Sequence, residues 1–154
     1  MIWFKDYTLD HLKNVRNANM TAHLGFEFTE VGPDFLKARL PVDHRTTQPF
    51  GILHGGASCV LAESLGSIAS WMTIDPDNYR AVGVEINANH IRAVTQGYVV
   101  GTCTPLHVGR RTQVWNIDIT EEATGKRVAI SRLTVAIIEH GTLSNQKTEV
   151  HLGV

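Results

Sequence analysis

A single carboxylate, Glu63, lies in the middle of a long apolar stretch. It is the only charged residue between His54 and Asp75. A carboxylate buried among apolar side chains is costly unless it is paired, hydrogen-bonded or neutral. Glu63 is therefore either a structural residue, satisfied by a backbone group or a neighbouring serine, or a catalytic carboxylate with a tuned pKa.

The beginning of the same stretch could bind a developing negative charge. Pro49 and Gly51 break any regular element, and His54-Gly55-Gly56 then leads into the apolar run. The first N–H groups of a helix have no intrahelical partner, and the helix dipole favours negative charge there. Two glycines would let a ligand approach these N–H groups closely.

The two features are too far apart to act on one atom within one chain. Gly55 and Glu63 are about eight residues apart, which is roughly 12 Å along a helix axis. They could act together if a second chain contributes one of them.

The run from His54 to about Thr73 predicts a buried helix. At about 100° per residue, one face carries Leu61, Leu65, Ile68 and Met72. The opposite face carries small residues around Glu63, namely Gly56, Cys59, Gly66, Ser67 and Ser70. Small residues leave room for a ligand or for another chain.

The remaining elements must position this helix. Residues 8–20 predict a short amphipathic helix, and residues 26–31 and 35–42 predict a hairpin around Gly32-Pro33-Asp34. Apolar residues then alternate in segments that begin at Tyr79 and that span 98–108, 111–120 and 127–138. These patterns predict an α+β fold in which a six-stranded antiparallel sheet wraps the long helix. An open sheet edge is a liability unless it is paired, which favours a dimer.

Composition sets the broad class. The 154 residues, 43% of them hydrophobic and 19% charged, predict one globular domain over residues 1–140 with a polar, frayed tail over 141–154. A net charge of -1 gives no reason to expect nucleic acid or an anionic membrane as a partner. The sequence shows no membrane span and no leader pattern, which favours a cytoplasmic protein. The histidines lack metal-ligand spacing, and we expect no metal.

Three motifs together resemble the hotdog-fold acyl-CoA thioesterases, the superfamily of 4-hydroxybenzoyl-CoA thioesterase. The first runs from Gln48 to Ser67 and reads Gln48-Pro-Phe-Gly-Ile-Leu-His-Gly-Gly-Ala-Ser-Cys-Val-Leu-Ala-Glu63-Ser-Leu-Gly-Ser67. The others are Glu85-Ile-Asn-Ala-Asn-His90 and Pro105-Leu-His107-Val-Gly-Arg110. The likeness runs from Met1 to about Ile138. Within the superfamily the chain is most similar to the branch that hydrolyses 1,4-dihydroxy-2-naphthoyl-CoA in menaquinone biosynthesis.

The resemblance implies a role for each matching residue. Glu63 would be the nucleophile or general base, and the Gly55 N–H would hold the thioester oxygen. Gln48 would orient the carbonyl or the attacking water, Ser67 would hold that water, and His54 would frame the loop. The implied coenzyme A contacts are Gly83, His90, Ile91, Arg92, Ala93, His107, Val108, Gly109, Arg110, Arg111 and Thr112. No cofactor is implied, because coenzyme A is part of the substrate.

The resemblance also implies a homodimer with active sites at the interface, usually paired into a homotetramer. Gly55 of one chain would then face Glu63 of the other. The aromatic acyl group of the branch suits the small residues around Glu63, while aryl, phenylacetyl and medium-chain thioesters remain open as substrates.

The basic residues have two interpretations. His90, Arg92, His107, Arg110 and Arg111 lie at predicted strand ends and turns. Taken singly, each of these residues is typical of a solvated turn. Taken as a group beside a thioesterase motif, they favour contacts with the phosphates of coenzyme A. Among other residues, Trp115 is expected in the core, Asp118 beside a cation, and Cys59 is not expected to be a nucleophile.

Two other functions compete with hydrolysis. A non-catalytic acyl-CoA-binding hotdog module would lack the helix carboxylate and would normally carry a DNA-binding segment. A hotdog hydratase or dehydratase would use a histidine and an acid in a different loop motif. Release of free thiol from an acyl-CoA distinguishes hydrolysis from both.

Overall fold

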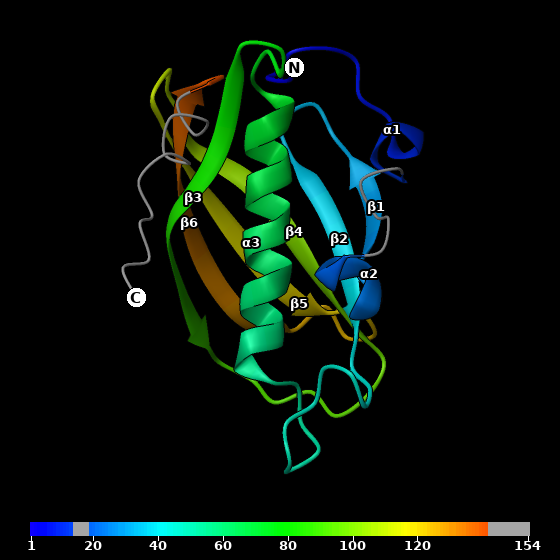
Figure 1. Ribbon diagram of the computed structural model, residues 1–154. Helices are drawn as coiled ribbons and strands as arrows, with labels where there is room; N and C mark the ends of the chain where they lie inside the picture. Colours follow the sequence, from blue (N-terminus) through cyan, green and yellow to red (C-terminus); the bar gives the residue numbers. More distant parts are fainter. Residues whose placement is uncertain (14–18, 142–154) are drawn as a thin grey trace, which may run out of the picture.

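The computed structural model describes residues 1–13 and 19–141. A central helix, α3 (Gly55–Met72), lies against one face of a sheet, with the short helices α1 (Leu9–Lys13) and α2 (Met20–His23) to one side (Figure 1). The strands are β1 (Glu27–Val31), β2 (Leu36–Pro41), β3 (Tyr79–His90), β4 (Tyr98–Val108), β5 (Thr112–Glu121) and β6 (Arg127–Glu139).

Local hydrogen bonds define both ends of α3. His54 is the N-cap, and its Nδ1 accepts the N–H of Gly56 at 2.8 Å, which satisfies one of the amides that a helix start leaves unpaired. At the other end the Thr73 hydroxyl donates to the Ser70 carbonyl at 2.8 Å. Within the described residues, no helix is long and apolar enough to cross a membrane.

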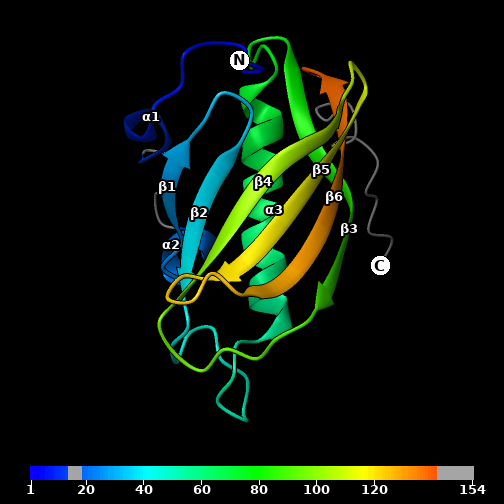
Figure 2. The same cartoon turned by 180° about the vertical axis from the view of Figure 1, so that it is seen from behind.

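The sheet places β3 at an edge. Its six strands run in the order β1-β2-β4-β5-β6-β3, and every neighbouring pair is antiparallel. The chain leaves β2, crosses the sheet through α3 and returns at the far edge as β3, as seen from behind in Figure 2. The curled sheet therefore holds α3 between its two edges, β1 on one flank and β3 on the other (Figure 1).

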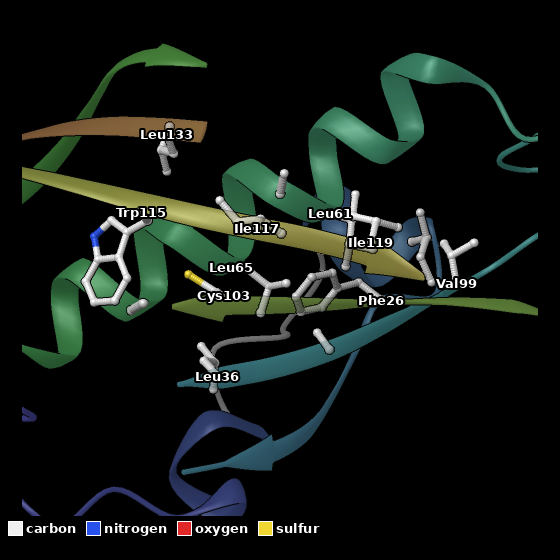
Figure 3. Packing of buried hydrophobic residues seen from close by; sticks show 14 of the residues in the cluster. Phe26, Leu36, Leu61, Leu65, Val99, Cys103, Trp115, Ile117, Ile119 and Leu133 are labelled. Carbon is white, nitrogen blue, oxygen red and sulfur yellow. The ribbon is translucent and has the colours of Figure 1, made fainter. Parts of the chain in front are cut away.

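The core forms where α3 meets the concave face of the sheet. Leu61 and Leu65 of α3 are fully buried in one cluster with Ile117 and Ile119 of β5 (Figure 3). Two hydrogen bonds also join the end of the helix to β5. Trp115 Nε1 donates to Ser70 Oγ at 2.7 Å, and Gln113 Nε2 donates to Thr73 Oγ1 at 2.8 Å. The placement of Trp115 in the core is thereby confirmed.

The predicted architecture is confirmed, but the helix wheel assigned two residues to the wrong face. Gly66 and Ser70, expected beside Glu63, are buried against the sheet. A Cβ on Gly66 would collide with the Leu133 side chain, and Ser70 accepts the Trp115 hydrogen bond. Ile68, expected to be buried, is only half-buried. Gly66 lies against Leu133 of β6, and Glu63 lies against Gly83 of β3, so the buried arc of α3 extends towards the β6–β3 side of the sheet.

The prediction of one helix over residues 8–20 was wrong. Asn19 has an extended backbone (φ −121°, ψ −178°) and caps α2, because its side chain accepts the Ala22 N–H at 3.1 Å. A continuous helix therefore cannot reach Met20. Residues 14–18 and the predicted tail beyond Gly141 lie outside the described residues.

Candidate active site

Glu63 lies on a half-buried part of α3 beside the edge strand β3. A Cβ on Gly83 would be 2.5 Å from Glu63 Oε1, so glycine is the residue that lets the carboxylate rest against β3. Ser67, one turn further along α3, donates its hydroxyl to the same oxygen at 3.3 Å. The structure thus brings Ser67 to Glu63, and its hydroxyl lies where it could also hold a water molecule. Gly83, expected as a coenzyme A contact, lies against the Glu63 carboxylate instead.

The beginning of α3 presents one free amide. The Gly56 N–H is bonded to the His54 ring, and the Ala57 and Ser58 N–H groups donate to the His54 carbonyl at 2.9 and 3.3 Å. In the described part of the chain, the Gly55 N–H has no such partner. A free N–H at the positive end of an 18-residue helix can stabilise a developing oxyanion.

A tight turn brings Gln48 to this helix end. The Gly51 N–H donates to the Gln48 carbonyl at 2.8 Å, and the Gln48 N–H donates to the Ile52 carbonyl at 2.9 Å. The chain then continues through Leu53, whose N–H donates to the Val94 carbonyl at 2.8 Å. These bonds fix the loop that the glycine and proline pattern indicated.

An ion pair holds the chain just before this turn. Arg45 Nη2 lies 2.6 Å from Asp43 Oδ2, and its guanidinium lowers the pKa of the Asp43 carboxyl to about 2. The Asp43 carbonyl accepts the N–H groups of Thr46 and Thr47 at 3.0 Å. The loop that carries Gln48 is therefore anchored by groups that keep their charge at neutral pH.

A cavity of about 320 Å³ opens at the beginning of α3. A Cβ on Gly55 would lie 2.8 Å from His90 Nε2, so the imidazole covers the glycine closely. Six of the predicted site residues line this cavity: Gln48, Gly55, His90, Ile91, Arg92 and Ala93. Glu63 is not among the lining residues, because it lies about two turns further along the helix.

The structure separates the predicted basic residues into two groups. His90 and Arg92 lie at the cavity just described. Arg110 and Arg111 line a different cavity, of about 420 Å³, together with Tyr79 at the opposite end of β3. Val108 and Gly109 lie near the end of α3, and the predicted contacts His107 and Thr112 flank the same turn. One chain alone therefore does not gather these residues into a single phosphate site.

A smaller cavity beside Glu63 was not expected from the sequence. It has a volume of about 180 Å³ and is lined by Phe26, Phe28, Thr21, Ser64, Ser67 and Ile68, with Asn19 at its edge. Ser67 thus contacts both this cavity and the Glu63 carboxylate. The only sequence signal that could have pointed to this cavity was the alternation of Phe26 and Phe28, and that pattern indicated only a strand.

Asp118 has the cation neighbour that the sequence analysis expected. Arg127 forms a two-point hydrogen bond with Asp118, at 2.8 and 2.6 Å, as expected for a cation partner. Burial raises the pKa of the Cys59 thiol, which disfavours the thiolate that a nucleophile requires. Within residues 1–13 and 19–141, no group of His, Cys, Asp and Glu side chains could hold a metal ion.

Comparison with known proteins identifies close relatives. Residues 50–128 match the Thioesterase superfamily. The chain is 49% identical, over 138 residues, to the 1,4-dihydroxy-2-naphthoyl-CoA hydrolase of Escherichia coli (strain K12), which covers 90% of this chain and 100% of that protein. It is 51% identical to the proofreading thioesterase EntH of Cronobacter sakazakii over 138 residues, 90% of this chain and 99% of that one.

A solved structure agrees with these matches. The crystal structure of a thioesterase from Haemophilus influenzae has a TM-score of 0.86 and 45% identity, covering 90% of this chain and 96% of its own.

Gly83→Ala tests the contact between β3 and Glu63. The added methyl group would collide with Glu63 Oε1, so we expect the carboxylate to turn away and lose its hydrogen bond with Ser67. A crystal structure of the variant would show the displacement. Thermal unfolding should report a loss of about 1 kcal/mol, a typical value for one hydrogen bond.

The matched control repeats Gly83→Ala in a Ser67→Ala background, where the bond is already absent and the additional loss should be smaller. A carboxylate that keeps its bond to Ser67 in the Gly83→Ala variant would contradict the assignment.

Proposed function

Because the chain belongs to the thioesterase superfamily and is a thioester hydrolase, we propose that it hydrolyses an acyl-CoA with an aromatic acyl group. The best candidate is 1,4-dihydroxy-2-naphthoyl-CoA, the substrate named for the E. coli relative. That substrate would place the protein in cytoplasmic menaquinone biosynthesis. The observation that carries the proposal is the free Gly55 N–H at the 320 Å³ cavity, since an unpaired amide at a helix start is suited to a thioester oxyanion.

The proposed reaction adds water across the thioester bond and releases the acid and the thiol of coenzyme A. The Gly55 N–H holds the carbonyl oxygen as negative charge develops there, an interaction that contributes roughly 3 kcal/mol in comparable enzymes. Glu63 attacks the carbonyl carbon or removes a proton from the attacking water. Ser67 holds the water, and Gln48 orients the carbonyl.

We propose that two chains form each active site. Gly55 and Glu63 are about 12 Å apart along α3, so a second chain must bring one towards the other. The edge strand β3 supports this arrangement. It is hydrogen-bonded only to β6 within the described sheet, and its Val84 side chain is 64% exposed. Two β3 edges that pair in antiparallel fashion would cover these groups.

The same pairing would reunite the basic residues. Antiparallel β3 strands, paired about their midpoint, bring Tyr79 of one chain near His90 of the other. The cavity with Arg110 and Arg111 would then lie beside the partner's cavity with Arg92. The proposed coenzyme A site accordingly takes His90, Ile91, Arg92 and Ala93 from one chain, and His107, Val108, Gly109, Arg110, Arg111 and Thr112 from the other. Two such dimers would form the expected tetramer.

Neither alternative function is favoured by the site. The two relatives described above are a hydrolase and a thioesterase, whereas a binding module would not need a carboxylate held by Ser67 and Gly83. We therefore retain hydrolysis as the single function.

The first test of the proposed function is Glu63→Gln. Loss of the catalytic carboxylate should lower kcat for 1,4-dihydroxy-2-naphthoyl-CoA by at least about 10²-fold, measured by release of free thiol. The control Glu30→Gln removes an exposed carboxylate that pairs with Lys37 on the far side of the sheet, and it should keep normal turnover. A folded Glu63→Gln protein with near-normal kcat would refute the role of Glu63.

Sedimentation velocity tests the two-chain site. We expect a dimer or a tetramer at the concentrations used in assays, because a monomer would leave the β3 edge unpaired and Gly55 far from any Glu63. Val84→Lys should weaken the association and reduce activity together, since the charge would be buried in the interface. Full activity in a species that sediments as a monomer would exclude a shared site.

Arg92→Ala and Arg110→Ala test the coenzyme A contacts. Each lost phosphate contact should be worth about 1–2 kcal/mol, so KM should rise about tenfold while kcat changes less. The effect should shrink for an acyl-pantetheine, which lacks the nucleotide, and raised salt should weaken the wild type more than the variants. Lys126→Ala, an exposed cation in the β5–β6 turn, is the control. If KM is unchanged in both variants at low salt, Arg92 and Arg110 are solvated residues of turns and do not contact coenzyme A.

A further inference from the structure

Ser58 of α3 carries a buried hydroxyl group that is not hydrogen-bonded. The residue is only 1% exposed, and its Oγ forms no hydrogen bond with any of the described residues. The other buried hydroxyls, those of Thr46, Ser70 and Ser131, each form a hydrogen bond of 2.6 to 2.7 Å. Because burial of an unpaired hydroxyl costs free energy, Ser58 is the exception that requires a partner from outside the folded chain.

The local backbone explains why this hydroxyl stays unpaired. A serine inside a helix can donate to the carbonyl four residues earlier, which here belongs to His54. That carbonyl already accepts the N–H groups of Ala57 and Ser58, at 2.9 and 3.3 Å, and a carbonyl oxygen has only two lone pairs. The first turn of α3 therefore offers the Ser58 hydroxyl no free acceptor.

The space next to this hydroxyl is the 320 Å³ cavity at the beginning of α3. Ser58 lines the cavity together with Gly55, and it is the one residue with a hydroxyl group among the described residues that do so. The two residues are three positions apart, and a helical side chain leans towards the turn that precedes it. Ser58 Oγ therefore lies on the same side of the helix start as the free Gly55 N–H, and two unpaired donors face one cavity.

Two neighbouring donors suit an oxygen atom that gains negative charge. When the nucleophile adds to the thioester carbon, the π electron pair of the carbonyl moves onto the oxygen, and it returns when the C–S bond breaks. The oxyanion has lone pairs for more than one hydrogen bond, and oxyanion holes combine backbone N–H groups with side-chain donors such as serine. The Gly55 N–H supplies one of these bonds, and a hydroxyl one turn further along the helix can supply another.

We propose that the Ser58 hydroxyl is a second hydrogen-bond donor to the thioester oxygen, beside the Gly55 N–H. This inference rests on the proposed function and deepens it by adding a catalytic residue to the site. Ser58 keeps its proton throughout the reaction and acts only through the hydrogen bond. Both donors belong to the same helix start, so their pairing does not depend on where the second chain lies. The substrate supplies the acceptor that the folded chain lacks.

The first experiment separates a catalytic role of Ser58 from a structural one. Ser58→Ala should lower kcat by about 10²-fold, the loss typical of one oxyanion donor, with a smaller change in KM. The loss should be equal for 1,4-dihydroxy-2-naphthoyl-CoA and benzoyl-CoA, because both present the same thioester oxygen. The Tm should not fall, because the substitution removes an unpaired polar group from the interior and alanine favours helices.

Ser70→Ala is the matched control. It removes a buried hydroxyl near the other end of the same helix, where the loss leaves Trp115 Nε1 without its acceptor. We expect the opposite result, a lower Tm with kcat close to that of the wild type. Ser58→Cys should recover part of the kcat that Ser58→Ala loses, because a thiol is a weak donor of similar size.

The second experiment identifies the substrate atom that Ser58 contacts. It uses two unreactive analogues of the same length. In the first, a ketone, a methylene group separates the carbonyl from the sulfur, so the oxygen is kept. In the second, a thioether, a methylene group replaces that carbonyl. Ser58→Ala should weaken inhibition by the ketone about three- to tenfold, the range for one neutral hydrogen bond, and should leave inhibition by the thioether unchanged.

Each contrary result has a defined meaning. Equal weakening of both analogues would place the Ser58 contact elsewhere on the substrate and overturn the inference. A folded Ser58→Ala protein with wild-type kcat would also overturn it, because the hydroxyl would then bind only a water molecule. So would a loss of activity that is matched by a loss of folded protein. Wild-type turnover by a Glu63→Gln protein would instead refute the proposed function, so the two failures are distinguishable.

Discussion

The structure depends on the burial of one apolar helix by a single curled sheet. Leu61, Leu65 and Met72 of α3 are fully buried, and the sheet closes around them from β1 to β3. The sheet covers the helix on one side, so only the opposite side can tolerate a charge, and Glu63 lies there. Because the sheet wraps around α3, its two edge strands lie on either side of Glu63. The β3 edge brings Gly83 against the carboxylate, and the β1 edge brings Phe28 to the neighbouring cavity.

Much of this arrangement could be predicted from the sequence because its signals are local. Alternating residues located the long strands to within two residues, and the glycine pair with the apolar run located α3. The helix wheel assigned Gly66 and Ser70 to the wrong face because it gives the relative angles of residues but not how far the neighbouring strands reach around the helix. The prediction of one helix over residues 8–20 failed because Asn19 caps a second helix. A short apolar pattern does not reveal such a break in a helix.

The site itself was only partly predictable. The cavity beside Glu63 joins β1 and α2 to α3, and no local pattern links segments so far apart in the sequence. The basic residues were separated for a topological reason. In the order β4-β5-β6-β3 every neighbour is antiparallel, so β3 and β4 run in opposite directions. Their final residues, His90 and Val108, must therefore lie at opposite ends of the sheet. The spacing of a motif identifies such residues but does not show at which end of the sheet they lie.

The antiparallel direction that separates these residues in one chain also explains how two chains can reunite them. A two-fold axis through the middle of β3 exchanges the ends of the strand. In the proposed dimer, every group at the His90 end would then gain a neighbour from the Tyr79 end of the partner, including Arg110 and Arg111. The same axis would turn one α3 against the other, so that a free Gly55 N–H could approach a carboxylate that its own helix keeps two turns away. The unpaired β3 edge and the divided site are thus two observations that the proposed second chain would account for together.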